Sequence, residues 1–300
     1  MKAGRATNLL IANTLLRSFI ILFLLAFMAC KGYTEQAASA GNSQAKQSDN
    51  PNDTSNKAAT KNTARIIHVV VALCDNEFQG IVPVPPRIGN GDDPANNLYW
   101  GAGYGVKTFF KRSNDWKIVS DARGPKPAVL ERVVFKRKDK DVYMVADAYR
   151  GREIKQSTID FFLFAAGGGT ESITIDEGAQ TATIYAGGGA DLIAYVGHDG
   201  LMDFSLDQYP QKLDDRQRDA VILACASKYY FNTPLRRTGA RPLLWTTGLM
   251  APEAYVLKAA IDGWILNEGG ERIRRRAAEA YNRYQRCGMR GALNLFSSEW

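Results

Sequence analysis

From residue 65 onward, short runs of apolar residues alternate with amphipathic stretches. The first run, residues 66–73, is rich in β-branched side chains and ends at Cys74, which is typical of a strand buried on both faces. Further strands are predicted over 141–146, 192–196, 220–224 and 241–246. Helices are predicted over 151–166, 251–265 and 270–296, with another over 98–110 that Asn97 would cap.

This alternation predicts an α/β fold in which a mostly parallel sheet carries helices on both faces, as a three-layer α/β/α arrangement. Two runs of three glycines, at 167–169 and 187–189, bracket the β-type segments 173–175 and 181–185. We interpret this part as a hairpin on flexible hinges. A phosphate-binding interpretation is less well supported, since neither glycine run stands between a strand and the start of a helix.

The N-terminal thirty residues have the pattern of an export signal. The uncharged apolar run 19–29 follows three basic residues and ends at Cys30, and it is too short to span a bilayer comfortably. Ala29 before Cys30 resembles a bacterial lipobox, although Phe27 stands where that pattern usually has Leu. We therefore predict a signal peptide over 1–30 with a lipid on Cys30, and an exported protein anchored to a membrane of the cell envelope. Plain secretion and an uncleaved anchor are the alternatives.

Residues 31–64 contain no Ile, Leu, Val, Phe, Met or Trp, so they cannot build a core. They are predicted to be a disordered tether, and residues 65–300 the single folded domain. The formal net charge of +7 is partly due to the signal, because the chain beyond residue 30 has 35 basic and 31 acidic residues. The basic cluster 272–276 lies in a helical stretch beside Glu271 and Glu279. We predict no nucleic-acid partner, and the sequence says nothing about oligomeric state.

Reactive side chains gather where the predicted strands end, and in parallel sheets such ends meet at one edge. The residues at these ends are Cys74, Asp75, Asp147, His198, Cys225 and Thr246. His198 and Cys225 together suggest a general base and a thiol nucleophile. Taken singly, each has a plainer interpretation, as a hydrogen-bonded turn residue and as a small buried apolar residue.

The segments around His198 and Cys225 resemble the caspase–gingipain (clan CD) cysteine peptidases and their bacterial CHAT relatives. The similar features are an apolar strand ending in Gly197-His198, a second strand ending in Ala224-Cys225, and the segment 238–248 with the helix after it. The resemblance covers residues 66–300 loosely, through short motifs. It implies a caspase-like sheet with Cys225 as nucleophile and His198 as base.

The resemblance also implies oxyanion stabilisation by backbone N–H groups near Gly200 and at Cys225. In the family Gly follows the His directly, whereas Asp199 intervenes here. That departure puts the oxyanion donor in doubt, and the charge of Asp199 would favour a protonated His198. The acidic Asp75 and Glu77 after the first strand favour a basic side chain in the substrate.

Cys74 has three interpretations, namely a bystander, a redox partner of Cys225, or a zinc ligand together with His198 and Cys225. No CxxC or HxxxH spacing supports zinc, so we predict neither a metal nor a cofactor. The function hypothesis is an exported cysteine hydrolase acting on a peptide or protein. The alternative is an inactive caspase-like binding or scaffold module, in which the Pro-rich loop 79–96 and the aromatic pair Tyr99-Trp100 would form the binding surface.

Overall fold

The computed structural model describes residues 64–176, 178 and 181–300, and its first strand, β1 (Arg65–Ala72), begins where the polar segment ends. The predicted signal peptide, the lipid site Cys30 and residues 31–63 of the predicted tether lie outside the described residues. Within the described ranges, no helix has both the length and the apolar composition needed to cross a bilayer.

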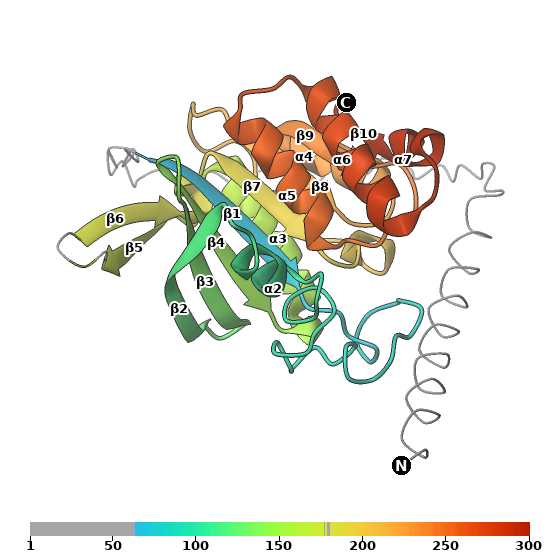
Figure 1. The fold of residues 1–300 in the computed structure, drawn as a ribbon, viewed down its shortest axis with the longest axis horizontal. Coiled ribbons are helices and arrows are strands. Elements are labelled where there is room, and N and C mark those ends of the chain that lie inside the picture. The colour runs from blue at the N-terminus through green and yellow to red at the C-terminus, as the bar shows by residue number, and fades with distance from the viewer. Residues whose placement is uncertain (1–63, 177, 179–180) are drawn as a thin grey trace, which may run out of the picture. The chain divides into compact units, whose positions relative to one another are not determined.

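Eight strands form one sheet in the order β10-β9-β8-β7-β1-β4-β3-β2 (Figure 1). Besides β1 they are β2 (Trp116–Lys126), β3 (Val129–Arg137), β4 (Val142–Tyr149), β7 (Leu192–Val196), β8 (Asp219–Leu223), β9 (Arg241–Thr246) and β10 (Phe296–Ser297). The five strands from β9 to β4 are parallel, whereas β3, β2 and β10 are antiparallel to their neighbours. The predicted α/β fold with a mostly parallel sheet is confirmed.

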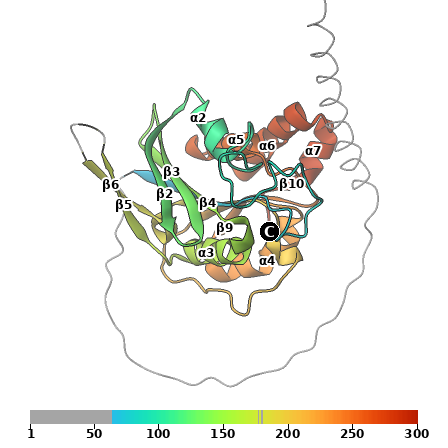
Figure 2. The same cartoon turned by 90° about the horizontal axis from the view of Figure 1, so that it is seen from below.

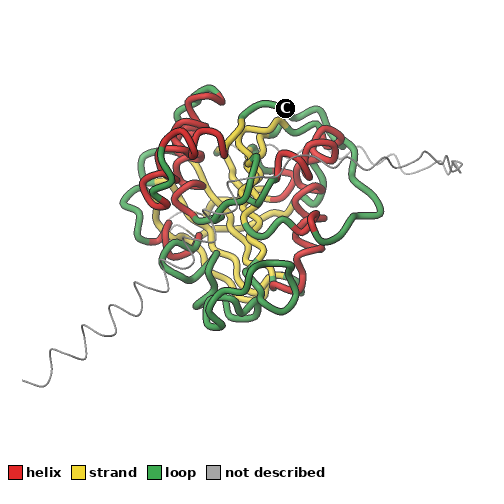
Figure 3. Tube along the Cα trace, turned by 90° about the vertical axis from the view of Figure 1, so that its right-hand side faces the viewer, coloured by secondary structure: helices red, strands yellow, loops and turns green. Residues whose placement is uncertain are grey.

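Helices cover both faces of this sheet (Figures 2 and 3). They are α2 (Val106–Lys111), α3 (Ile154–Ala166), α4 (Ser227–Thr238), α5 (Ala254–Ile265), α6 (Gly270–Gln285) and α7 (Met289–Leu295). Because successive side chains of a strand point to opposite faces, Val69 and Leu223 pack toward α2, α5 and α6, and Val70 and Ile222 toward α3 and α4. Two cores therefore sandwich the sheet.

The sequence did not reveal β2 and β3, which extend the sheet beyond β4. β2 is an edge strand, and most of its residues are at least partly exposed. A strand of this kind tolerates polar residues at most positions, so it lacks the apolar alternation by which strands are recognised.

The helix predicted over 98–110 is wrong for most of its length, because only α2 forms. A β-carbon on Gly101 would lie 2.2 Å from the carbonyl oxygen of Ala95, so the chain folds back tightly there. The Asn97 amide caps no helix but bonds both the N–H and the C=O of Cys74, at 3.0 and 2.8 Å. The long C-terminal helix is likewise split into α6 and α7 by the left-handed Arg286, at φ 53°.

The predicted hairpin is confirmed as β5 (Glu171–Asp176) and β6 (Thr181–Ala186). Its glycine runs are not flexible hinges, because they pack backbone against backbone. The N–H of Gly188 donates to Gly168 O at 2.9 Å, and a β-carbon on Gly187 would lie 2.1 Å from Gly169 O. The N–H of Gly187 donates to His68 Nδ1 at 2.8 Å, so the amides of Gly187 and Gly188 both have protein partners and are not available to a phosphate. Glycine is needed here because any side chain would force the two runs apart.

Candidate functional site

His198 and Cys225 stand at the same height on neighbouring parallel strands. Val196 of β7 is paired with Leu223 of β8, and each candidate residue follows two positions later. The ladder continues past the strand ends, since Gly197 N–H donates to Leu223 O at 3.2 Å. Neighbouring strands lie about 4.8 Å apart, so the topology brings the predicted base and nucleophile to one edge of the sheet.

Cys225 is followed by a strained turn into α4. Ala226 has φ 49°, a left-handed conformation that is unfavourable for a residue with a β-carbon. Its N–H donates to Gly248 O at 2.8 Å. Beneath the turn, the Thr246 hydroxyl donates to Ala224 O and accepts the N–H of Ser227 at 3.2 Å. Thr246 is thus fully buried and stabilises the turn that follows Cys225. It does not line a cleft, contrary to the prediction.

The thiol of Cys225 is half-buried and contacts the backbone of one residue twice. The N–H of Met250 donates to Sγ at 3.4 Å, and Sγ donates to the carbonyl oxygen of Met250 at 3.6 Å. Burial raises the pKa of Cys225 above its ordinary value, the Met250 N–H opposes that shift, and the nearby charge of Asp199 adds to it. In this resting state the thiol form is therefore favoured.

The imidazole of His198 is held by Asp203, which the sequence reasoning did not single out. Nε2 lies 2.7 Å from Asp203 Oδ2, and that oxygen also accepts the N–H of Gly80 at 3.0 Å. An ionised carboxylate can only accept, so Nε2 carries the proton and a neutral ring keeps Nδ1 as an acceptor. The ring is 7% exposed, and the Tyr195 hydroxyl donates to the backbone carbonyl of His198 at 2.9 Å. This is the tautomer that a general base acting through Nδ1 requires.

Asp199 is a fully buried carboxyl group with half of its hydrogen-bonding capacity unused. Oδ1 accepts the N–H of Leu201 at 3.0 Å, whereas Oδ2 has no hydrogen-bond partner among the described residues. The pKa of Asp199 is raised to about 7, mainly by burial and also by the charge of Asp203, while the hydrogen bond from the Leu201 N–H opposes the shift. Near neutral pH this group is thus divided between two charge states.

Gly200 begins a short 3-10 helix, Gly200–Met202, directly after Asp199. A β-carbon there would lie 2.6 Å from a ring carbon of Phe204, so packing demands glycine at this position. The predicted oxyanion role of Gly200 therefore stays a prediction. Packing against Phe204 is by itself enough to explain why this residue is a glycine.

Cys74 follows the end of β1 by two positions, and β7 lies between β1 and β8. Two strand spacings are about 10 Å, longer than the 4.4–6.8 Å between Cα atoms that a disulfide spans. Cys74, Cys225 and Cys287 all carry thiols. Burial raises the pKa of Cys74 to about 12 despite a hydrogen bond with Tyr99, so this thiol is chemically quiet. Of the three interpretations of Cys74, that of a bystander without a chemical role fits these facts best.

Two further predicted cleft residues have structural roles. Asp75 folds a local turn, with Oδ1 accepting the N–H groups of Glu77 and Phe78 at 2.9 and 3.3 Å. Asp147 lies inside β4 and is fully buried, and Arg132 donates to both of its oxygens at 2.6 and 2.7 Å. Burial alone would raise the pKa of Asp147, but hydrogen bonds from Arg132 and His68 lower it to about 2. The prediction that Asp147 faces the cleft is wrong, because its carboxylate is fully buried and both of its oxygens accept hydrogen bonds from Arg132.

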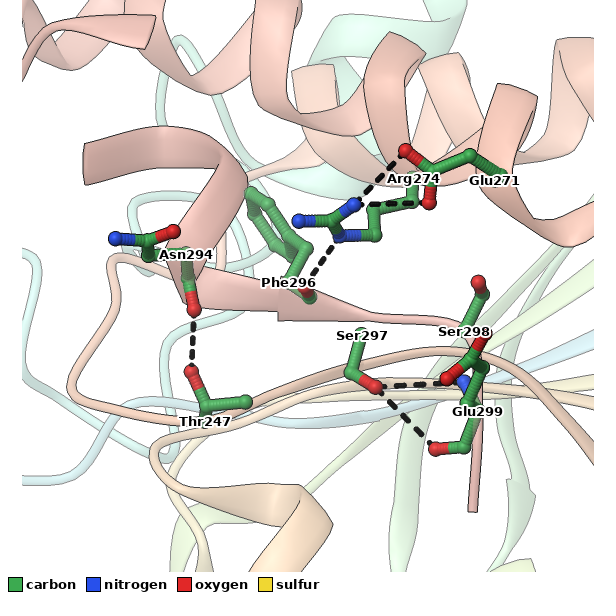
Figure 4. Close-up of a pocket in the computed structure, with 8 residues that line it drawn as sticks. All are labelled: Thr247, Glu271, Arg274, Asn294, Phe296, Ser297, Ser298 and Glu299. Atoms are coloured by element: carbon green, nitrogen blue, oxygen red, sulfur yellow. Dashed lines mark hydrogen bonds and ion pairs between the residues drawn. The ribbon is translucent and has the colours of Figure 1, made fainter. Parts of the chain in front are cut away.

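No group of three or more His, Cys, Asp or Glu side chains arranged to hold a metal occurs in the described part of the chain. A surface pocket of about 400 Å³ lies beside β10 and α6 and is drawn in Figure 4. Arg274, the cationic residue that lines it, is already engaged by Glu271 and by the carbonyl oxygens of Leu293 and Phe296. Neither Cys225, His198 nor Asp199 lines this pocket.

Three contributors to this edge escaped the sequence reasoning, namely Asp203, Met250 and Tyr281. The Tyr281 hydroxyl accepts the N–H of Ala251 at 3.2 Å, next to the residue that contacts Cys225. An acid five residues after a strand-end histidine was a readable signal for Asp203. Met250 acts through its backbone and Tyr281 comes from a distant helix, so no local pattern marks either of them.

The chain matches no protein-family model, no curated protein and no solved structure. What this edge of the sheet can do chemically must therefore be inferred from its own residues.

Proposed function

We propose that this chain is an exported, lipid-anchored cysteine hydrolase of peptidase type, with Cys225 as nucleophile and His198 as general base. The observation that carries the proposal is the equal height of these two residues on β7 and β8, which follows from the pairing of Val196 with Leu223. The left-handed turn at Ala226 supports it, because strain directly after a strand-end thiol is typical of functional positions. The resemblance of the same two segments to caspase–gingipain peptidases agrees with this reading of the site.

In the proposed reaction, the Cys225 thiol gives its proton to Nδ1 of His198, and the thiolate attacks the carbonyl carbon of the scissile amide. The tetrahedral intermediate collapses when the imidazolium returns that proton to the departing amine, which leaves a thioester on Cys225. Water, deprotonated by His198, then releases the acid and restores the thiol. Asp203 would keep the ring oriented and stabilise its protonated form.

The raised pKa of Cys225 makes this proposal testable. A half-buried thiol whose ionisation is disfavoured is scarcely nucleophilic near pH 7 without a base. If His198 is that base, the reactivity of Cys225 at neutral pH depends on His198. If Cys225 has no such partner, its reactivity follows only its own high pKa.

The test is iodoacetamide alkylation of the full chain in detergent between pH 6 and 9, followed by peptide mass for each cysteine. Exposed Cys287 is the internal reference for a solvent-accessible thiol, and buried Cys74 is the internal reference for an intact fold. We expect Cys225 to react measurably at pH 6–7, and His198→Gln to slow that reaction while Cys74 stays protected. A Cys225 that reacts at the same rate in both proteins at every pH, with Cys74 protected, would refute the hydrolase.

Export and anchoring are part of the same proposal and rest on the sequence pattern around Cys30. Expression of the full chain in a bacterium, followed by membrane fractionation and mass measurement, tests them. We expect a membrane-bound product whose N-terminal peptide starts at Cys30 and carries acyl chains, and Cys30→Ser should release it or leave the signal uncleaved. An unmodified Cys30 would remove the lipid anchor from the proposal.

The second candidate is an inactive binding module, and the covered, high-pKa thiol of Cys225 favours it. The surface first expected for such a module needs correction, because Tyr99 and Trp100 are buried in the core and unavailable to a partner. Phe78 and Val82, 50% and 72% exposed in the loop after β1, are better placed. The alkylation experiment separates the two candidates.

A further inference from the structure

A short backbone segment lies across the sulfur of Cys225. Residues 248–251, which we call the strap, connect β9 to α5. At one end Gly248 O accepts the N–H of Ala226, and in the middle Met250 makes its two contacts with Sγ. At the other end the N–H of Ala251 donates to the Tyr281 hydroxyl of α6 at 3.2 Å.

These contacts oppose the chemistry that the proposed reaction needs. The thiol proton is directed to the carbonyl oxygen of Met250, so it is not available to His198. The Met250 N–H donates to the sulfur and occupies one of its two lone pairs, so the backbone of the strap lies against the atom that would attack the substrate. With the strap in this position, the thiol proton is directed away from the base and the backbone of Met250 covers one side of the sulfur, so both proton transfer to His198 and attack on a carbonyl carbon are hindered.

The residues of the strap differ in how firmly they are held against the rest of the fold. The side chain of Met250 is 9% exposed and packs in the core on the α5 side of the sheet, whereas that of Leu249 is 55% exposed. The Ala251 end is tied by a single side-chain hydrogen bond from another helix, and Tyr281 itself is 8% exposed. One hydroxyl group therefore contributes to how often the strap lifts from the sulfur.

We propose that the strap holds Cys225 in a closed resting state, and that Tyr281 is a positioning residue that sets the equilibrium between the closed and open states. This inference rests on the proposed function, because closure matters only if Cys225 is a nucleophile. In the open state the thiol proton is released from Met250 and reaches His198, and an extended substrate chain takes the place of the strap. The open state is the reactive one.

The test compares Tyr281→Phe with Tyr284→Phe in the full chain in detergent. Tyr284 is the matched control, since it is on the same helix but stacks on Tyr255, at a 4.2 Å centroid distance. We expect Tyr281→Phe to speed both iodoacetamide alkylation of Cys225 at pH 8 and amide exchange of residues 248–251 about fivefold, the factor expected from one hydrogen bond of ordinary net strength. Tyr284→Phe should leave both rates at the wild-type value, and Cys74 should stay protected in every variant.

The same pair is measured again with His198→Gln. The strap and the base act on different steps, so Tyr281→Phe should give the same fold-increase in both backgrounds. Unchanged alkylation and exchange in Tyr281→Phe, or an equal increase in Tyr284→Phe, would overturn the strap proposal whatever His198 does. If Tyr281→Phe accelerates alkylation while His198→Gln has no effect at any pH, the strap stands as a cover over the thiol and the general-base assignment falls.

Discussion

The Nε2 atom of His198 lies 2.7 Å from the Oδ2 atom of Asp203, five residues further along the chain. The histidine comes from the end of β7, and the carboxylate returns to it across the short 3-10 helix between them. Since the same Asp203 oxygen also accepts the N–H of Gly80, the pair joins the end of β7 to the loop that follows β1. Within the proposed dyad, this contact fixes which ring nitrogen is the base.

The first prediction concerns that contact. Asp203→Asn removes the negative charge that favours a protonated His198 and weakens the preference for a basic Nδ1. We expect alkylation of Cys225 at pH 7 to fall about tenfold, in the range found when an orienting partner is lost. Asp207→Asn, which changes an exposed acid in the same loop, is the control and should have no effect. Equal rates in wild type and Asp203→Asn would remove Asp203 from the site.

A second prediction follows from the buried Asp199, whose pKa burial raises to about 7. The folded state keeps a proton that the unfolded chain releases near pH 4, so the free energy of unfolding should fall as pH rises from about 4 to 7. This group contributes at most about 4 kcal/mol to that fall. Asp199→Asn should lose this part of the slope, as measured by urea unfolding at several pH values. If the free energy of unfolding changes with pH in the same way for the two proteins, the raised pKa of Asp199 is contradicted.

The third prediction addresses the buried ion pair between Arg132 and Asp147. Arg132→Met leaves a fully buried carboxylate without its main partner, which typically costs about 3–5 kcal/mol. Arg241→Met is the matched control, because Arg241 pairs with Asp219 from a side chain that is 62% exposed, and it should cost below about 1 kcal/mol. Urea unfolding at pH 7 measures both. A similar loss of unfolding free energy in the two variants would mean that burial does not determine how much the ion pair between Arg132 and Asp147 stabilises the fold.

The fourth prediction distinguishes a packed glycine from a merely left-handed one. Gly187 and Gly178 both have positive φ, at 62° and 85°, so alanine is strained at either position. At Gly187 the new β-carbon would meet backbone, at 2.1 Å from Gly169 O, whereas at Gly178 none of the described residues beyond its chain neighbours lies within 4 Å of it. We expect Gly178→Ala to cost about 1 kcal/mol and Gly187→Ala roughly 3 kcal/mol, because overpacking adds to strain. Thermal unfolding of the two variants measures the difference in stability. Equal costs would show that the backbone of the two glycine runs shifts to make room for the new β-carbon.

Much of the parallel sheet was determined by local sequence. The continuous apolar run before Cys74 is a strand because β-branched residues buried on both faces fit little else, and the runs ending at Val196 and Thr246 were predicted with the bounds that the structure has. Gly197 and Ala224-Cys225 could be placed at strand ends for the same reason. The edge strand β2 lacks this signal, since solvent satisfies the polar side chains that it carries. β3 lacks it because the buried Glu131 and Arg132 interrupt its apolar run, and their partners Trp100 and Asp147 come from other segments of the chain.

The roles of the strand-end residues were decided only by tertiary structure. Asp147 and Thr246 look alike in the sequence, as polar residues near a strand end, yet one is consumed by Arg132 and the other braces the turn beneath Cys225. The partners that settle the state of the Cys225 thiol, Met250 and Tyr281, reach it through the fold from 25 and 56 positions away. Side-chain periodicity reports which face of an element is buried, because burial is a local pattern. Hydrogen-bond partners and pKa depend on distances between elements, and these exist only once the chain has folded.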